Sequence, residues 1–135
     1  MIPLTMKEYT TTLRVRYKET DKMQVVYYSN YLVWFEVART ELFRKLGCIY
    51  SDIEKDLGLY LMVADAHCRY LKPAYYDDRL EIHCYIESVG RSGLGFSYKV
   101  NRDTELLAEG ETQHVFCDKK GKPQRIPEKV REVIS

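Results

Sequence analysis

The pattern of apolar and polar residues changes twice along the chain, and each segment predicts its own kind of element. Residues 9–17 are rich in β-branched side chains and alternate between Leu13 and Tyr17, which predicts a strand. In residues 30–47 the apolar side chains recur at steps of three and four, which is typical of an amphipathic helix. From residue 60 the period returns to two, and we expect a series of strands.

The predicted long helix presents one apolar stripe: Tyr31, Phe35, Ala38, Leu42 and Leu46. Trp34 and Val37 widen this stripe, so we expect the helix to be covered on much of its circumference. Gly47 suits the position just after the helix end, where the backbone often turns left-handed. Ser51 and Glu54 then have the spacing of a capping box, which predicts a shorter helix that stops near Gly58.

Short turns separate the four strands that are predicted after the two helices. The first strand ends at Pro73, and the last, ELLAEGETQHVFCD, precedes a short terminal helix with Pro127 in its first position. The inward faces of the two middle strands are Leu80, Ile82, Cys84 and Ile86, then Leu94, Phe96, Tyr98 and Val100. Because tight turns join antiparallel neighbours, this order predicts an α+β fold in a single domain over residues 1–135.

Charge and cysteine content indicate which kinds of partner the protein can have and in which cell compartment it lies. The chain has 21 lysines and arginines against 20 aspartates and glutamates, a balance that argues against a nucleic-acid partner but leaves room for a local basic patch. The first ten residues lack the basic and apolar regions of a signal peptide, and no run approaches the roughly 18 apolar residues of a membrane span. Four widely spaced cysteines without a C-x-x-C pair indicate reduced thiols. We therefore expect a cytoplasmic protein with no integral membrane association.

Two stretches of the chain carry a family resemblance. RVRYKETDKMQVVYYSNYLVWFEVARTELFR has an acid after threonine, then V-V-Y, then Asn-Tyr at the start of the long helix, and RYLKPAYYDDRLEI follows later. Together they resemble the hotdog-fold thioesterases of the 4-hydroxybenzoyl-CoA thioesterase family, which includes the Tol–Pal-associated type. The resemblance covers roughly residues 10–125.

The resemblance implies a hotdog fold, in which a five-stranded antiparallel sheet wraps around one long central helix. It also implies subunits that pair as a homodimer or a homotetramer, with the active site at the dimer interface. The implied activity is hydrolysis of an acyl-CoA thioester to a carboxylic acid and free CoA. No cofactor is expected, because the coenzyme A is part of the substrate.

Asp21 is the residue on which this interpretation depends most. A lone aspartate in such a position is usually a loop or turn residue. The resemblance instead implies that Asp21 is the catalytic carboxylate, as a nucleophile or as a general base toward water. Gln24 stands where glycine is common in the family, and Tyr17 matches a tyrosine that either orients the acid or is simply buried.

Tyr28 stands where some members of the family have histidine and others an aromatic residue. The resemblance therefore implies a role for its backbone N–H, which would point at the thioester oxygen from the start of the helix. Unpaired N–H groups and the positive end of a helix suit a developing oxyanion. We expect the side chain of Tyr28 to serve in packing.

Further substrate-binding candidates are charged residues outside the family motif. Arg91 in the GRSG turn, with Lys119, Lys120 and Lys122 after the last strand, could bind the phosphates of coenzyme A or form an ordinary solvated turn. Asp65 and His67 share the polar face of a predicted strand and could border the acyl pocket.

Neighbouring histidines and cysteines suggest a metal site, but strand geometry argues against it. His67 and Cys68, like His83 and Cys84, are adjacent in predicted strands, so their side chains point to opposite faces. The spacing of histidines and cysteines matches no structural zinc pattern. We therefore predict no metal site.

Two other functions fit the same scaffold. A hydratase or dehydratase would also bind acyl-CoA but needs a histidine paired with an acid, and Glu36 is the only helix acid that invites this hypothesis. A non-catalytic acyl-CoA-binding or assembly protein would have no need of Asp21.

Overall fold

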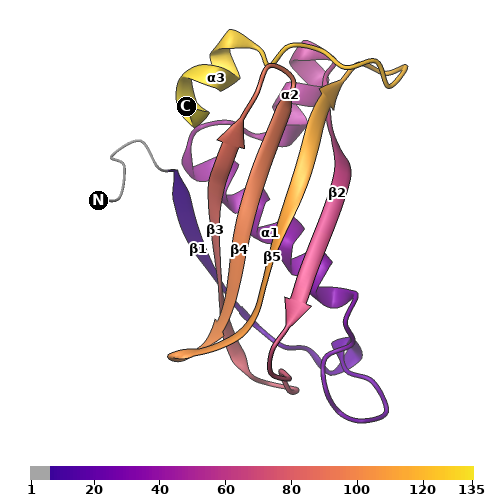
Figure 1. Cartoon of the computed structure of the whole chain (residues 1–135), viewed down its shortest axis with the longest axis vertical. Helices are drawn as coiled ribbons and strands as arrows, with labels where there is room; N and C mark the ends of the chain where they lie inside the picture. The colour runs from indigo at the N-terminus through magenta and orange to yellow at the C-terminus, as the bar shows by residue number, and fades with distance from the viewer. Residues whose placement is uncertain (1–6) are drawn as a thin grey trace.

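The computed structural model describes residues 7–135 and contains one antiparallel sheet with a long helix against one of its faces (Figure 1). The elements in chain order are β1 (Glu8–Arg14), the short 3-10 helix η1 (Tyr17–Glu19), α1 (Asn30–Lys45), α2 (Tyr50–Leu57), β2 (Tyr60–Tyr70), β3 (Arg79–Val89), β4 (Gly93–Arg102), β5 (Glu105–Cys117) and α3 (Glu128–Ile134). The five strands lie in the order β1-β3-β4-β5-β2, so β1 and β2 form the edges. The predicted α+β class and the predicted wrapping of a five-stranded sheet around one long helix are confirmed.

The core lies between α1 and the concave face of the sheet. The helix contributes Tyr31, Trp34, Phe35, Ala38, Leu42 and Phe43, all buried. The inward faces predicted for the two middle strands are buried as expected, since the alternating side chains of β3 and β4 point toward α1. Gly47 has φ of +87° directly after the helix end, which confirms its predicted position.

Gly110 in β5 allows α1 to approach the middle of the sheet closely. A Cβ atom at this position would overlap the carbonyl oxygen of His67 and lie 2.7 Å from Cε2 of Phe35. Phe35 in turn stacks on Tyr98 of β4, with ring centroids 4.1 Å apart. This contact fixes α1 against β4 and β5, and so fixes where the N-terminal end of the helix lies.

Three predicted boundaries are wrong. The first strand ends at Arg14, although Val15 still exchanges backbone hydrogen bonds with Asp77 and Asp78 just before β3. The capping box does not form: α2 begins at Tyr50, whose ring packs on Phe43, and its N-cap is Ile49. Pro127 is the N-cap of α3 and lies one residue before the position that we predicted.

The edge strand β2 is largely exposed, unlike the central strands. Met62 and Val63 are each about half exposed, at 53% and 52%, next to a register shift between Val63 and Asp65. Exposed apolar side chains also occur on α1, at Leu32, Val33 and Val37. No helix in the described part of the chain has the length and apolar character needed to cross a membrane.

Candidate active site

Asp21 lies on a tight bend in the loop between η1 and α1. Thr20 and Val26 pair across the base of the bend, and the N–H of Asp21 donates to the carbonyl of Val25 at 2.9 Å. Gln24 has φ of +66°, in the left-handed region that favours glycine. The bend therefore forms with glutamine in the conformation for which the family usually has glycine.

The carboxylate of Asp21 is exposed, and within the described residues only one of its two oxygens accepts a hydrogen bond. Its Oδ1 accepts a hydrogen bond from the N–H of Met23 at 2.8 Å. Its Oδ2 accepts none from any residue between 7 and 135. An oxygen with free lone pairs can attack a carbonyl carbon or remove a proton from water.

The backbone N–H of Tyr28 lies just before the first turn of α1. The carbonyl of Tyr27, in the same peptide group, accepts from the N–H of Asn30 at 3.0 Å, which sets the direction of this group. The carbonyl of Tyr28 accepts from the N–H of Tyr31 at 3.3 Å and from the hydroxyl of Tyr70 at 3.0 Å. Within the described residues the N–H of Tyr28 has no acceptor. This free donor sits at the positive end of the helix dipole.

One cavity of about 380 Å³ contains both groups. It is lined by Asp21, Val26, Tyr27, Tyr28, Tyr31, Tyr70, Leu71, Lys72 and Pro73. The residue with a free carboxylate oxygen and the residue with a free backbone N–H therefore line the same cavity. That arrangement can attack a carbonyl carbon while it stabilises the negative charge that develops on the carbonyl oxygen.

Two of the phenols that line the cavity, those of Tyr31 and Tyr70, stay neutral at ordinary pH. Burial raises the pKa of Tyr31, whose ring also packs edge-on against Tyr70 at 5.0 Å. Burial likewise raises the pKa of Tyr70, to about 12, with smaller effects from nearby Cys68. The Tyr70 hydroxyl therefore remains protonated and can keep donating to the carbonyl of Tyr28.

Tyr17 does not lie where either of its predicted roles would place it. Its side chain is 75% exposed, which excludes the alternative of simple burial. The ring packs edge-on against Tyr76, with centroids 5.6 Å apart. Among the described residues no hydrogen bond joins Tyr17 to Asp21, although the backbone carbonyl of Tyr17 accepts from the Thr20 hydroxyl at 2.7 Å.

The predicted phosphate-binding residues lie at the other end of the sheet from Asp21 (Figure 1). Arg91 is in the turn between β3 and β4, and the exposed residues Lys119, Lys120 and Lys122 follow β5. The Asp21 cavity borders the opposite end of β2, at Tyr70. The ten paired residues of β2 span about 30 Å at the rise of a strand. The same subunit therefore does not bring this cluster and Asp21 together.

Asp65 and His67 do not border the acyl pocket within this chain. In the ladder with β5 they lie opposite Gln113 and Glu111, both exposed, whereas the intervening Ala66 lies opposite buried Thr112. Since alternate residues point to opposite faces, Asp65 and His67 are on the face of the sheet away from α1. Neither lines the cavity at Asp21.

Tyr70 and Lys72 are site residues that the sequence analysis missed. Tyr70 ends β2 and donates to the start of α1, and Lys72 lines the cavity while its Nζ lies 2.9 Å from Glu105. The signal was present in RYLKPAYYDDRLEI, which the family resemblance singled out without assigning a role to any residue in it.

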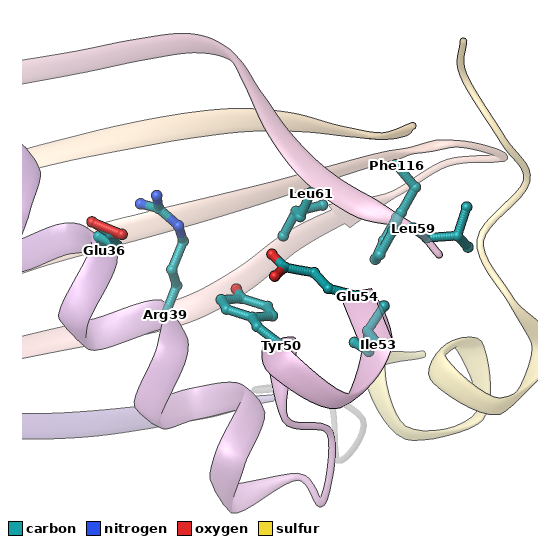
Figure 2. Close-up of a pocket in the computed structure, with 8 residues that line it drawn as sticks. All are labelled: Glu36, Arg39, Tyr50, Ile53, Glu54, Leu59, Leu61 and Phe116. Atoms are coloured by element: carbon teal, nitrogen blue, oxygen red, sulfur yellow. The ribbon is translucent and has the colours of Figure 1, made fainter. Parts of the chain in front are cut away.

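A second, smaller cavity of about 130 Å³ lies between α1, α2 and the start of β2 (Figure 2). Figure 2 shows Arg39 reaching from α1 toward the sheet, with Tyr50 and Glu54 on α2 and Glu36 one turn before Arg39. Glu36 is the acid on which the hydratase alternative depends. Neither a histidine nor Asp21 lines this cavity, so Glu36 has no partner for that chemistry there.

Histidines and cysteines do not gather in the described structure. His83 is partly exposed and lies 3.5 Å from Glu8, while the adjacent Cys84 is fully buried, as expected for neighbours on a strand. Over residues 7–135 no three His, Cys, Asp or Glu side chains form a group able to bind a metal ion.

Comparison with known proteins identifies relatives over nearly the whole chain. The family model of the thioesterase-like superfamily matches residues 15–134. A Bacillus subtilis protein, provisionally named an acyl-CoA thioesterase, is 40% identical over 79% of this chain and 78% of its own. An acyl-CoA thioester hydrolase of Escherichia coli O6:H1 is 33% identical over 87% of this chain and 89% of its own.

Solved structures share the fold as well as the sequence. The crystal structure of a DHNA-CoA thioesterase from Staphylococcus aureus superposes with a TM-score of 0.84 and 35% identity. The match covers 87% of this chain and 80% of the other.

Proposed function

The chain belongs to the thioesterase-like superfamily and is an acyl-CoA thioesterase, and we propose that Asp21 and the backbone N–H of Tyr28 carry out its reaction. The observation that carries this assignment is that Asp21, with a free Oδ2, and Tyr28, with a free backbone N–H, both line one cavity. The fold resemblance to solved thioesterases explains where such a site would lie, but the roles of the two groups rest on their chemistry.

The proposed reaction begins with the thioester carbonyl between the two groups. Either Asp21 Oδ2 attacks the carbonyl carbon, or it takes a proton from water as the water attacks. The N–H of Tyr28 and the positive end of α1 stabilise the oxyanion that forms. Its collapse breaks the carbon–sulfur bond and expels the thiolate of coenzyme A. In the first case water then hydrolyses the mixed anhydride on Asp21, and both routes end in a carboxylic acid and free CoA.

A second copy of the chain completes the site in this proposal. The exposed edge of β2 and the exposed apolar side chains Met62, Val63 and Leu32 favour edge-to-edge pairing with a copy of itself. Two-fold pairing of one strand with itself is antiparallel, so the start of one β2 lies opposite the end of the other. The partner's phosphate-binding cluster would then approach the Asp21 cavity, which the same subunit's cluster does not.

Light scattering of the purified protein tests the assembly. We expect a homodimer or a homotetramer at micromolar concentration. A particle of 16.0 kDa alone would contradict the shared site, because Arg91 would then have no route to the cavity.

The phosphate-binding role of Arg91 has its own test and is our first prediction. Arg91→Glu should raise KM about fivefold, the equivalent of about 1 kcal/mol for an exposed ion pair, with less effect on kcat. The effect should shrink with added salt, because exposed charges are screened over about 8 to 10 Å. Lys99→Glu, an equal change of charge at an exposed position on the outer face of β4, is the matched control. Equal KM values in both variants would move the phosphate site elsewhere.

We also propose that the substrate carries a flat or apolar acyl group and that the protein is cytoplasmic. Four tyrosines line the cavity, which suits a flat or apolar acyl group, and a relative of known structure acts on DHNA-CoA. The four cysteines are free thiols, which agrees with the reducing cytoplasm.

Measuring thiol release from a panel of aliphatic and aromatic acyl-CoAs is the experiment that tests the function. No release from any member would overturn it.

A further inference from the structure

We propose that Glu19 is a positioning residue that sets the geometry between Asp21 and the N–H of Tyr28; this rests on the function proposed above. Glu19 lies two residues before Asp21 and does not line the cavity. It is 4% exposed, and it is the only buried acid among residues 7–135. A carboxylate in that environment needs a structural or functional reason, because burying a charge is costly unless it is paired.

The side chain of Glu19 joins the loop to the inside of α1. Oε1 accepts from the backbone N–H of Arg16 at 2.8 Å. Oε2 accepts from the indole N–H of Trp34 at 2.9 Å and lies 3.3 Å from the guanidinium of Arg16. Trp34 is buried in the core of the domain, one turn inside the helix. The carboxylate therefore ties the segment before Asp21 to a buried side chain of the helix.

The backbone of the same residue holds the segment after Asp21. The carbonyl oxygen of Glu19 accepts from the N–H of Tyr27 at 2.9 Å and from the side-chain amide of Asn30 at 2.9 Å. Tyr27 immediately precedes Tyr28, and Asn30 is the first residue of α1. One residue thus fixes both arms of the bend that carries Asp21, together with the peptide group that presents the Tyr28 N–H.

The ionised form of Glu19 is the one that can do this. Burial by itself would raise the pKa of the carboxyl group, but the hydrogen bonds from the Arg16 backbone, from Trp34 and from the Arg16 side chain together lower the pKa below its ordinary value. Two oxygens that only accept hydrogen bonds can serve donors on two sides at once. Glutamine keeps the size of the side chain but replaces one acceptor by a donor, so either Arg16 or Trp34 loses its partner.

The distinguishing experiment is a double-mutant cycle with Asp21. We expect Glu19→Gln to lower kcat for thioester hydrolysis about 10²-fold with little change in KM, because small misplacements of catalytic groups are that costly. In the Asp21→Asn background the same change should lower kcat less than about threefold, since the group that it positions is already gone. Trp34→Phe removes one donor and should show a weaker form of the same non-additivity. Glu41→Gln, which loses a partly exposed pair with Arg44 on the same helix, is the control and should change nothing in either background.

A second measurement applies even if the double variant is too slow to assay. Amide exchange followed by NMR should show faster exchange at the N–H of Tyr27 in Glu19→Gln, with protection in β3, β4 and the middle of α1 retained. Equal losses of kcat in both backgrounds, or an unchanged Tyr27 amide together with an unchanged kcat, would overturn the positioning role. Full activity of Asp21→Asn alone would instead overturn the proposed mechanism, so the two failures can be told apart.

Discussion

Glu19 and Asp21 lie in one loop, two residues apart, and their surroundings are opposite. Glu19 is buried at the base of the loop, where both oxygens accept hydrogen bonds. Asp21 is exposed at the bend, where one oxygen accepts from Met23 and the other is free among the described residues. A carboxylate with hydrogen bonds to both oxygens supports the structure, while a carboxylate with a free oxygen is available for chemistry. Substitutions at these two acids, at Tyr28 and at Gln24 test that division.

The largest effect is expected at Asp21. Asp21→Asn keeps the size of the side chain and the oxygen that accepts from Met23, so the midpoint of thermal unfolding should not change. The amide can neither attack the carbonyl well nor take a proton from water, and kcat should fall about 10² to 10⁴-fold. KM should change little. Thioester hydrolysis followed by thiol release measures both constants, and a folded variant with most of its activity would remove Asp21 from the mechanism.

Unlike Asp21, Glu19 should contribute to the stability of the fold, and this contribution should depend on pH. Its pKa is lowered in the folded protein, so the folded state binds fewer protons than the unfolded state near the ordinary pKa of glutamate. The stabilisation is therefore complete above the unfolded pKa of about 4.3 and is lost as pH falls through the lower folded pKa.

We expect Glu19→Gln to lower the free energy of unfolding by about 2 kcal/mol at pH 7, because it leaves a buried donor without its charged acceptor. The difference from the wild-type protein should shrink below about pH 4 as Glu19 becomes protonated. Chemical unfolding at several pH values measures this. A difference that does not depend on pH would mean that the charge of Glu19 contributes nothing.

A substitution at Tyr28 should have a smaller effect on kcat than one at Asp21. The proposed donor is its backbone N–H, and its ring packs on Tyr27 at 4.5 Å between centroids. Tyr28→Phe keeps the ring and the N–H, so kcat should change less than about threefold, within the usual range for surface substitutions. A heavy loss of kcat with normal folding would show that the phenol takes part directly.

The smallest effect is expected at Gln24, at the tip of the bend. Its φ of +66° strains a residue with a Cβ atom by about 1 kcal/mol, and glycine would relieve that strain. Glycine also gains about 0.4 to 1 kcal/mol of entropy in the unfolded chain. The two terms nearly cancel, and Gln24→Gly should change the free energy of unfolding by less than about 0.5 kcal/mol. A larger loss of stability would mean that the glutamine side chain has a role of its own.

Elements with a strong apolar period were predictable residue by residue. The stripe of α1 and the alternating faces of β3 and β4 are set by which side chains must leave water, so the periods of three to four and of two translate directly into structure. Boundaries were less predictable. Val15 continues the alternation of β1, yet the strand ends one residue earlier, and where it ends depends on a partner segment more than 60 residues away.

In the candidate site, too, placements that depend on residues close together in the sequence were more predictable than those that depend on distant ones. The family resemblance implied that Asp21 and the N–H of Tyr28 share a site, and both residues line one cavity because both lie in the short loop before α1. Asp65 and His67 were proposed from their shared polar strand face, and Arg91 from its charged turn. Strand alternation sends Asp65 and His67 to the outer face, and the length of the sheet separates Arg91 from Asp21.

Sequence patterns were enough to predict the kinds of elements, their order and the loop before the long helix in which Asp21 lies, since these depend on residues a few positions apart. The tertiary structure alone decided that Glu19 is buried on Trp34, that Tyr70 reaches the carbonyl of Tyr28, and that Gly110 gives α1 its close approach to the sheet. Each of these contacts joins residues that are 15 or more positions apart. No local pattern encodes such distances, because they depend on how the whole helix packs against the sheet.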